Sequence, residues 1–178
     1  MDHLWSPWRL AYVTGVRPDT GCVFCQAQPP PRPSDASPSE GPPPPSDLIV
    51  FNGDRCYVIL NLYPYNNGHL LVVPRRHVPS LSALTPGELQ ELALLTQRAE
   101  RALMEAYQPH GLNVGINLGK PGGAGILEHL HVHAVPRWNG DTNFMTVVGE
   151  ARVLPENLGS SASRLRPIFS RLAQEQDR

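Results

Sequence analysis

Residues 129–133 read His129-Leu130-His131-Val132-His133, and this alternation of imidazole and apolar side chains is the most informative pattern in the sequence. Successive side chains of a β-strand point to opposite faces of the sheet. The pattern therefore predicts a strand over residues 129–136 that buries one face and presents three histidines on the other. A structural strand would normally carry Val, Thr or Tyr here, because imidazoles in mixed protonation states are costly to bury. We interpret the histidine face as a chemical site rather than a solvated stripe.

The chemistry that suits these histidines is nucleophilic attack on phosphorus. A neutral imidazole is a good nucleophile near neutral pH, and the phosphoramidate that it forms can be cleaved again. Just before the histidines, residues 122–125 read Gly-Gly-Ala-Gly. Such a loop can bring backbone N–H groups close to phosphate oxygens. Glycine loops are also common hairpin connectors, so this loop alone does not identify a phosphate site.

The rest of the pattern indicates an α+β fold. Residues 48–51 and 56–60 are rich in strand formers, and residues 69–74 form an apolar run that ends at a proline. Residues 85–107 begin with a capping-box sequence and repeat apolar residues every three or four positions, which predicts an amphipathic helix. Residues 111–118 predict a further strand. The order β-β-β-α-β-β predicts an antiparallel sheet with a long helix on one face.

Composition excludes several classes of protein. The chain has 178 residues, of which 40% are hydrophobic and 17% charged, and its net charge is -1. These values are typical of one soluble globular domain and provide no strong field for a nucleic acid polymer. The sequence has no apolar run of the roughly 18 residues that a membrane helix needs and no signal-peptide layout at its start. We therefore expect a cytoplasmic protein that binds a small anion, and neither a nucleic acid polymer nor a membrane.

Local composition divides the chain into four segments. Residues 27–46 are rich in proline and lack an apolar period, which predicts an extended or disordered linker. We expect an N-terminal segment at 1–26, a folded domain at 47–158 and a tail at 159–178 that forms an amphipathic helix. Pro167 within the tail weighs against that helix.

Two of the three cysteines lie close together, in Cys22-Val23-Phe24-Cys25. This spacing suits a metal ion better than a disulfide framework and implies a reducing compartment. A tetrahedral zinc site would need two more ligands, most plausibly imidazoles, and two unliganded thiols are the alternative. Cys56 lies in an apolar run, where we expect a buried side chain without a chemical role.

Together, the histidine run, the glycine loop and residues 61–74 resemble the histidine triad superfamily of nucleotide hydrolases and transferases. The resemblance covers about residues 48–140. It is closer to the diadenosine tetraphosphate phosphorylase branch, which has strings similar to residues 60–66, 68–70, 128–133 and 136–138. It implies a histidine triad fold whose sheet is extended by homodimerisation.

The resemblance also implies roles for individual residues. His131 would attack the α-phosphate and carry the nucleotidyl group, while His133 would hold phosphate oxygens and His69 would support both from the neighbouring strand. Asn61 would lie near the nucleoside and Asn117 beside the phosphate chain, unless both are turn-forming asparagines. The remaining phosphate contacts would come from the glycine loop, at Gly123 and Gly125.

Zinc-bearing relatives and the related uridylyltransferases imply that His77 and His129 complete a structural zinc site with Cys22 and Cys25. The ion would connect the histidine strand to the N-terminal segment. We expect no organic cofactor. The sequence departs from many hydrolase members at Ile126, where they have a glutamine; isoleucine cannot donate a hydrogen bond, which weakens a simple hydrolase interpretation.

We therefore expect a homodimeric nucleotidyltransferase that cleaves dinucleoside polyphosphates through a covalent nucleotidyl group on His131, with inorganic phosphate as acceptor. One alternative is a hydrolase that uses water on dinucleoside polyphosphates or nucleoside phosphoramidates. Another is a non-enzymatic nucleotide-binding or scaffold protein. In that case the histidines would serve zinc and structure, and the proline tract with Trp5 and Trp8 would recruit partners.

Overall fold

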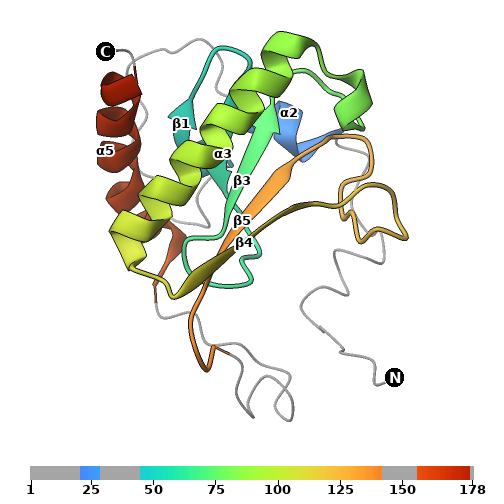
Figure 1. Ribbon diagram of the computed structural model, residues 1–178. Helices are drawn as coiled ribbons and strands as arrows, with labels where there is room; N and C mark the ends of the chain where they lie inside the picture. The colour runs from blue at the N-terminus through green and yellow to red at the C-terminus, as the bar shows by residue number, and fades with distance from the viewer. Residues whose placement is uncertain (1–20, 29–44, 142–155, 177–178) are drawn as a thin grey trace, which may run out of the picture.

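A computed structural model describes residues 21–28, 45–141 and 156–176. Trp5, Trp8 and most of the proline-rich stretch lie outside these residues, so the predicted linker has no structural counterpart here. The described strands form one antiparallel sheet in the order β1-β2-β3-β5-β4 (Figure 1). Their bounds are β1 (Ile49–Asn52), β2 (Cys56–Leu60), β3 (Leu70–Pro74), β4 (Gly111–Ile116) and β5 (Val132–Arg137).

Helix α3 (Pro86–Tyr107) lies diagonally across one face of this sheet (Figure 1). Its N-terminus has the predicted capping box: the Thr85 hydroxyl accepts from the Glu88 backbone N–H, and the Glu88 carboxylate accepts from the Thr85 N–H. Pro86 occupies the first helical position, where its missing N–H costs nothing. The predicted α+β fold, with a long helix on an antiparallel sheet, is therefore confirmed.

Helix α5 (Leu158–Gln176) packs beside α3 and against β1 (Figure 1). Pro167 lies inside the helix. The helix is held on both sides of the proline, because the Arg166 guanidinium donates to the Ile49 carbonyl at 3.1 Å and the buried Phe169 ring stacks on Phe51 at 5.9 Å. Tertiary contacts thus outweigh the local cost of proline in a helix.

The short helix α2 (Val23–Ala27) contacts the sheet face opposite α3. The Cys56 thiol reaches the Glu88 carbonyl of α3, whereas the next side chain, Tyr57, donates its hydroxyl to the Phe24 carbonyl of α2 at 2.8 Å. Neighbouring residues of a strand point to opposite faces, so the two helices lie on opposite sides of β2. Two 3-10 turns complete the described elements, η1 (Pro45–Leu48) and η2 (Leu81–Ala83).

Strand β5 begins later than predicted. Of the three histidines only His133 belongs to it, because the Leu130 N–H donates to the Val78 carbonyl at 2.7 Å instead of joining the sheet. Strand β4 lies at the edge of the sheet, next to β5. Among the described residues, no helix has both the length and the apolar character that crossing a bilayer requires.

Candidate active site and metal site

His131 immediately precedes β5 and is 6% exposed. Its Nδ1 lies 2.9 Å from the His129 carbonyl oxygen. A carbonyl oxygen can only accept, so this contact places the ring proton on Nδ1 and leaves the lone pair on Nε2. Burial lowers the pKa of His131, which favours the neutral ring. The arrangement can therefore present a neutral nitrogen nucleophile.

Phe24 of α2 packs against His131, with ring centroids 5.0 Å apart. It also contacts the His129 ring edge-on, at 5.4 Å. Phe24 is 5% exposed, and its carbonyl accepts the buried Tyr57 hydroxyl. The sequence reasoning missed Phe24, although its place between two candidate metal ligands was the available signal. This side chain contributes to the burial that keeps His131 neutral.

His133 is connected to His69, with 3.0 Å between His133 Nδ1 and His69 Nε2. His69 Nδ1 accepts the Tyr65 backbone N–H at 3.1 Å and lies 3.3 Å from the Asn61 amide nitrogen. Because Nδ1 of His69 faces donors, its proton lies on Nε2 and is donated to His133. Neutral His133 must then carry its own proton on Nε2. The fully buried His69 thus orients His133 as a hydrogen-bond donor.

Both predicted ligand-binding asparagines bond to the protein itself. The Asn61 carbonyl oxygen accepts the Tyr63 N–H at 3.0 Å, in addition to the amide contact with His69. The Asn117 amide donates to the Gly123 carbonyl at 3.3 Å. Each asparagine therefore takes part in a turn beside the histidines.

The glycine loop, residues 117–125, follows β4 and leads toward the histidines. Gly119 and Gly123 have φ angles of 68° and 86°, a region that favours glycine. A Cβ at Gly122 would lie 2.3 Å from the Leu118 carbonyl oxygen, so that position also requires glycine. Gly125 is exposed in the same loop. The turn is closed by the Gly123 N–H, which donates to the Lys120 carbonyl at 3.0 Å.

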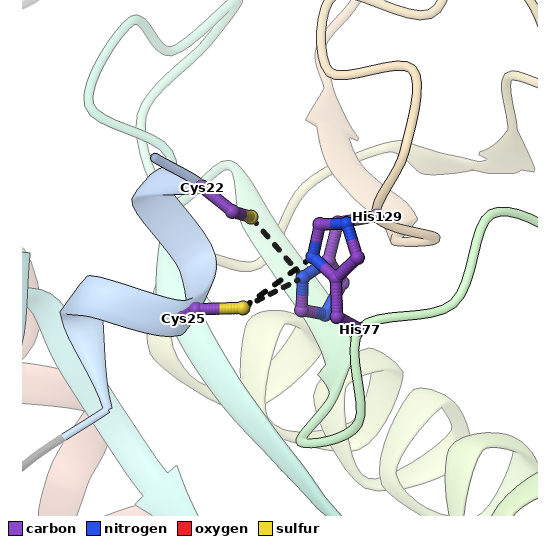
Figure 2. Close-up of side chains that lie close together, drawn as sticks. All are labelled: Cys22, Cys25, His77 and His129. Atoms are coloured by element: carbon purple, nitrogen blue, oxygen red, sulfur yellow. Dashed lines mark hydrogen bonds between the residues drawn. The ribbon is translucent and has the colours of Figure 1, made fainter. Parts of the chain in front are cut away.

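A second cluster joins α2 to the first residue of the histidine run, His129 (Figure 2). The ligand atoms of four residues lie within 4.8 Å of one another: Cys22, Cys25, His77 and His129. These are the four residues that the family resemblance implied as metal ligands. They come from three segments of the chain that are far apart in sequence.

The geometry of this metal-capable cluster fits a tetrahedral ion. The sulfur-to-nitrogen distances are 3.2 Å from Cys22 to His129, 3.4 Å from Cys25 to His77 and 3.6 Å from Cys25 to His129. Tetrahedral bonds to zinc imply a separation of roughly 3.5 Å between sulfur and nitrogen ligands. His129 Nε2 lies 2.8 Å from the Pro74 carbonyl, which places the proton there and leaves Nδ1 to face the sulfurs.

Electrostatics also favour a cation in this cluster. Burial raises the pKa of the Cys25 thiol, and the adjacent Cys22 raises it further. Burial lowers the pKa of His129, and His77 and His131 lower it further, although the Pro74 carbonyl acts in the opposite direction. Two neighbouring thiolates and two neutral imidazoles would be stabilised by a positive ion. The donor set is the sulfur and nitrogen combination that zinc prefers.

Comparison with known proteins identifies relatives. The HIT domain family profile matches residues 45–140. The chain is 42% identical over 173 residues to a Mycobacterium tuberculosis AP-4-A phosphorylase, covering 96% of this chain and 86% of that protein. It is 32% identical to a Dictyostelium discoideum bis(5'-adenosyl)-triphosphatase, covering 68% of this chain and 85% of that one. A crystal structure of a zinc-bound histidine triad family protein from Mycobacterium smegmatis superposes with a TM-score of 0.59 at 28% identity, covering 72% of this chain and 87% of that chain.

Proposed function

The chain belongs to the histidine triad (HIT) family, and on that premise we propose that it is a nucleotidyltransferase that cleaves dinucleoside polyphosphates and transfers a nucleotidyl group to inorganic phosphate. The observation that carries the proposal is His131, a buried neutral imidazole whose Nδ1 is bonded to the backbone, so that Nε2 is left to react. The similarity to an AP-4-A phosphorylase over nearly the whole chain supports diadenosine tetraphosphate as the substrate.

In the first proposed step, His131 Nε2 attacks the α-phosphorus of one nucleotide. The bond between this phosphorus and the bridging oxygen breaks, and the remaining nucleotide leaves with the electron pair. The His131 ring then carries the nucleotidyl group as a phosphoramidate, while its Nδ1 proton stays bonded to the His129 carbonyl. With diadenosine tetraphosphate, the leaving product is ATP.

In the second proposed step, an oxygen of inorganic phosphate attacks the same phosphorus. The phosphorus–nitrogen bond breaks, ADP leaves, and His131 regains its lone pair. The His133 Nε2 proton, oriented through His69, and the Gly125 backbone N–H would stabilise charge on the α-phosphate oxygens, and Gly123, whose N–H closes the turn on Lys120, would shape the loop at these oxygens. We place Asn61 near the nucleoside and Asn117 beside the phosphate chain, where each would also maintain its turn.

We also propose that the metal-capable cluster holds a structural zinc ion. Zinc would cross-link α2 to the histidine run, and because His129 contributes both a ring nitrogen to the cluster and a carbonyl to His131, it would hold the nucleophile in register. The zinc-bound relative supports this choice of metal. A reduced cysteine pair fits a cytoplasmic protein.

Strand β4 supports a homodimer formed through the sheet edge. This edge strand carries Val114, which is 51% exposed, and its outer backbone groups have no neighbouring strand among the described residues. Pairing with the same strand of a second copy would satisfy both features. Light scattering tests this proposal directly, and a monomeric mass at micromolar concentration would contradict it.

A hydrolase is the second candidate, supported by the similarity to a bis(5'-adenosyl)-triphosphatase. It would use the same residues and differ only in accepting water in the second step. The deciding experiment incubates the protein with diadenosine tetraphosphate, with and without inorganic phosphate, and separates the nucleotides by anion exchange.

ADP plus ATP formed only with phosphate would support the phosphorylase. AMP plus ATP, or ADP alone, formed without phosphate would contradict it in favour of a hydrolase. No turnover would contradict both and favour a nucleotide-binding protein. His131→Asn, measured in parallel, shows whether any turnover depends on the proposed nucleophile.

A further inference from the structure

Lys120 is the only lysine in the sequence, and it lies in the glycine loop. Its carbonyl accepts the Gly123 N–H at 3.0 Å, so the lysine opens the turn that Pro121 and Gly122 complete. The side chain is exposed. A turn whose other members are glycine and proline therefore carries one long cationic side chain.

The loop and His131 lie at the same end of neighbouring strands. Ile116, the last residue of β4, pairs with Val132, the first residue of β5. The next residue along β4 is Asn117, which begins the loop, and the residue before Val132 is His131. The Asn117 amide donates to the Gly123 carbonyl, which ties the start of the loop to its glycines. Lys120 thus lies in the loop that starts at the strand end next to the proposed nucleophile.

Lys120 also differs from five of the described arginines in what its charge contacts. Among the described residues, carboxylates pair with the guanidinium groups of Arg76, Arg101, Arg137, Arg164 and Arg171. No salt bridge or side-chain hydrogen bond joins Lys120 to another described residue. Its charge is therefore available to an anion from outside the described fold.

The groups that the proposed function places at the attacked phosphate are imidazoles and loop N–H groups. His131, His133 and the loop N–H groups offer hydrogen bonds and no full charge. Each phosphate of a polyphosphate chain carries negative charge, which neutral donors compensate only in part. A lysine ammonium is a compact charge on a flexible stem with three donors, and it suits phosphates whose position varies.

We propose that Lys120 binds the phosphates of the leaving nucleotide, beyond the attacked phosphorus, and is a specificity-determining residue for substrates with a polyphosphate chain. The inference rests on the proposed function and deepens it. Lys120 would distinguish substrates with a polyphosphate chain from substrates without one. His131 and His133 would act on the α-phosphate that both kinds of substrate contain.

The test compares wild type with Lys120→Met, which removes the charge, and Lys120→Arg, which keeps it. One substrate is diadenosine tetraphosphate and the other is adenosine 5′-phosphoramidate, which has an α-phosphate but no chain. We expect Lys120→Met to lower kcat/KM for the tetraphosphate by about tenfold, as loss of a hydrogen bond to a charged group would. Turnover of the phosphoramidate should be unchanged, and Lys120→Arg should restore most of the loss.

A binding arm makes the test independent of turnover. Calorimetry should show that Lys120→Met weakens the binding of ATP about tenfold and leaves the binding of AMP unchanged. Arg101→Met is the matched control, because it removes the same charge from an exposed side chain of α3 that pairs with Glu175. It should leave both affinities as they are in wild type.

Each outcome bears on one proposal. If wild type cleaves neither substrate while ATP binding still depends on Lys120, the proposed function fails and the assignment of Lys120 stands. The assignment of Lys120 is overturned if Lys120→Met lowers kcat/KM equally for both substrates or for neither. It is also overturned if the variant changes only the KM for inorganic phosphate. Failure of wild type to bind ATP more tightly than AMP would also overturn it.

Discussion

The metal-capable cluster and the glycine loop both lead to the segment that carries His131, and they are built differently. The cluster brings side chains from three distant segments around the fully buried His129. The glycine loop is a single segment shaped by its backbone, and residues 118–123 are all exposed. The difference fits the division of labour that we propose, in which the cluster holds the proposed nucleophile in place and the loop contacts the substrate.

The same contrast predicts different dynamics. Few buried contacts and backbone held by a small number of hydrogen bonds are features of segments that open at low free-energy cost. The glycine loop has these features, with the Lys120–Gly123 turn and the Asn117 amide as its connections. At the cluster, Phe24 and His129 are both buried and in contact. Hydrogen exchange should therefore be faster in the loop than in α2 of the metal-loaded protein.

The largest expected effect on activity comes from changing His131, the residue to which both regions lead. His131→Asn should lower kcat by about 10³-fold or more, because the variant lacks the proposed nucleophile. Wild type incubated with labelled substrate and no phosphate should retain label after an alkaline quench, since phosphoramidates survive base, and the variant should retain none.

The matched control for this variant is His110→Asn. It replaces an exposed histidine whose Nδ1 accepts the Asn139 N–H at the far end of β4. It should turn over like wild type. Equal label on wild type and His131→Asn would contradict the covalent step.

The second-largest effect is expected from a substitution that disrupts the metal-capable cluster and leaves the glycine loop unchanged. Cys25→Ser should lower the bound zinc from about one ion per chain to less than about half, because a hydroxyl is a poor zinc ligand. It should also lower Tm, and lower kcat/KM by about 10–100-fold through the lost anchoring of His129. Elemental analysis and calorimetry measure the first two quantities.

Cys56→Ala provides the comparison for the cysteine variant. Cys56 is fully buried outside the cluster, and burial, with nearby Glu91 and Glu88, raises the pKa of its thiol to about 12. This variant should keep its zinc. A Cys25→Ser protein that also keeps a full equivalent of zinc would show that the cluster is not the metal site.

The third effect is expected from a substitution that distorts the glycine loop and leaves the metal-capable cluster unchanged. Gly122→Ala should lower kcat/KM for diadenosine tetraphosphate by about tenfold, because the new Cβ displaces the loop from the Leu118 carbonyl and misplaces phosphate contacts. Zinc content should not change. Gly111→Ala is the control, since a Cβ there meets no atom within 4 Å. Equal activities of the two variants would contradict a role of loop shape.

The smallest effect concerns the segment that carries His77. The preceding residue, Arg76, contacts the Glu88 carboxylate at 2.7 Å, which fastens this segment to α3. Arg76, followed by the Thr85 N–H, lowers the pKa of Glu88 from 4.5 to about 2. Glu88→Gln should lower the free energy of unfolding at neutral pH by about 1 kcal/mol, given the partly exposed partner.

The pH dependence tests the sign of that contribution. A carboxyl whose folded pKa is depressed stabilises the protein fully above its unfolded pKa, and the contribution is lost as the pH falls. The difference between wild type and Glu88→Gln should therefore shrink between pH 4.5 and about 2. Urea unfolding in chelator, with Glu100→Gln as a control on the same helix, measures it. A constant difference would contradict the assigned pKa.

Most of the fold could be predicted because its signals are local. The Thr85 capping box and the apolar repeat that follows it specify α3 through neighbouring residues alone. The start of β5 could not be predicted in this way, since the Leu130 N–H bonds to Val78, far away in sequence. The expectation that Pro167 weighs against a helix was wrong for the same reason, because contacts with residues distant in sequence hold the helix around it.

The sequence alone determines the pattern of strands and helices, the glycine turn and the identity of the histidines and cysteines. These depend on backbone conformation and side-chain chemistry, which each residue carries with it. The folded chain adds the proton positions on His69, His129, His131 and His133, and the packing of Phe24 on the nucleophile. These depend on which carbonyl, N–H or ring lies opposite each imidazole. For His129 and His133 that partner comes from a segment distant in sequence, and for His131 and His69 the local backbone has to fold before the partner lies opposite the ring.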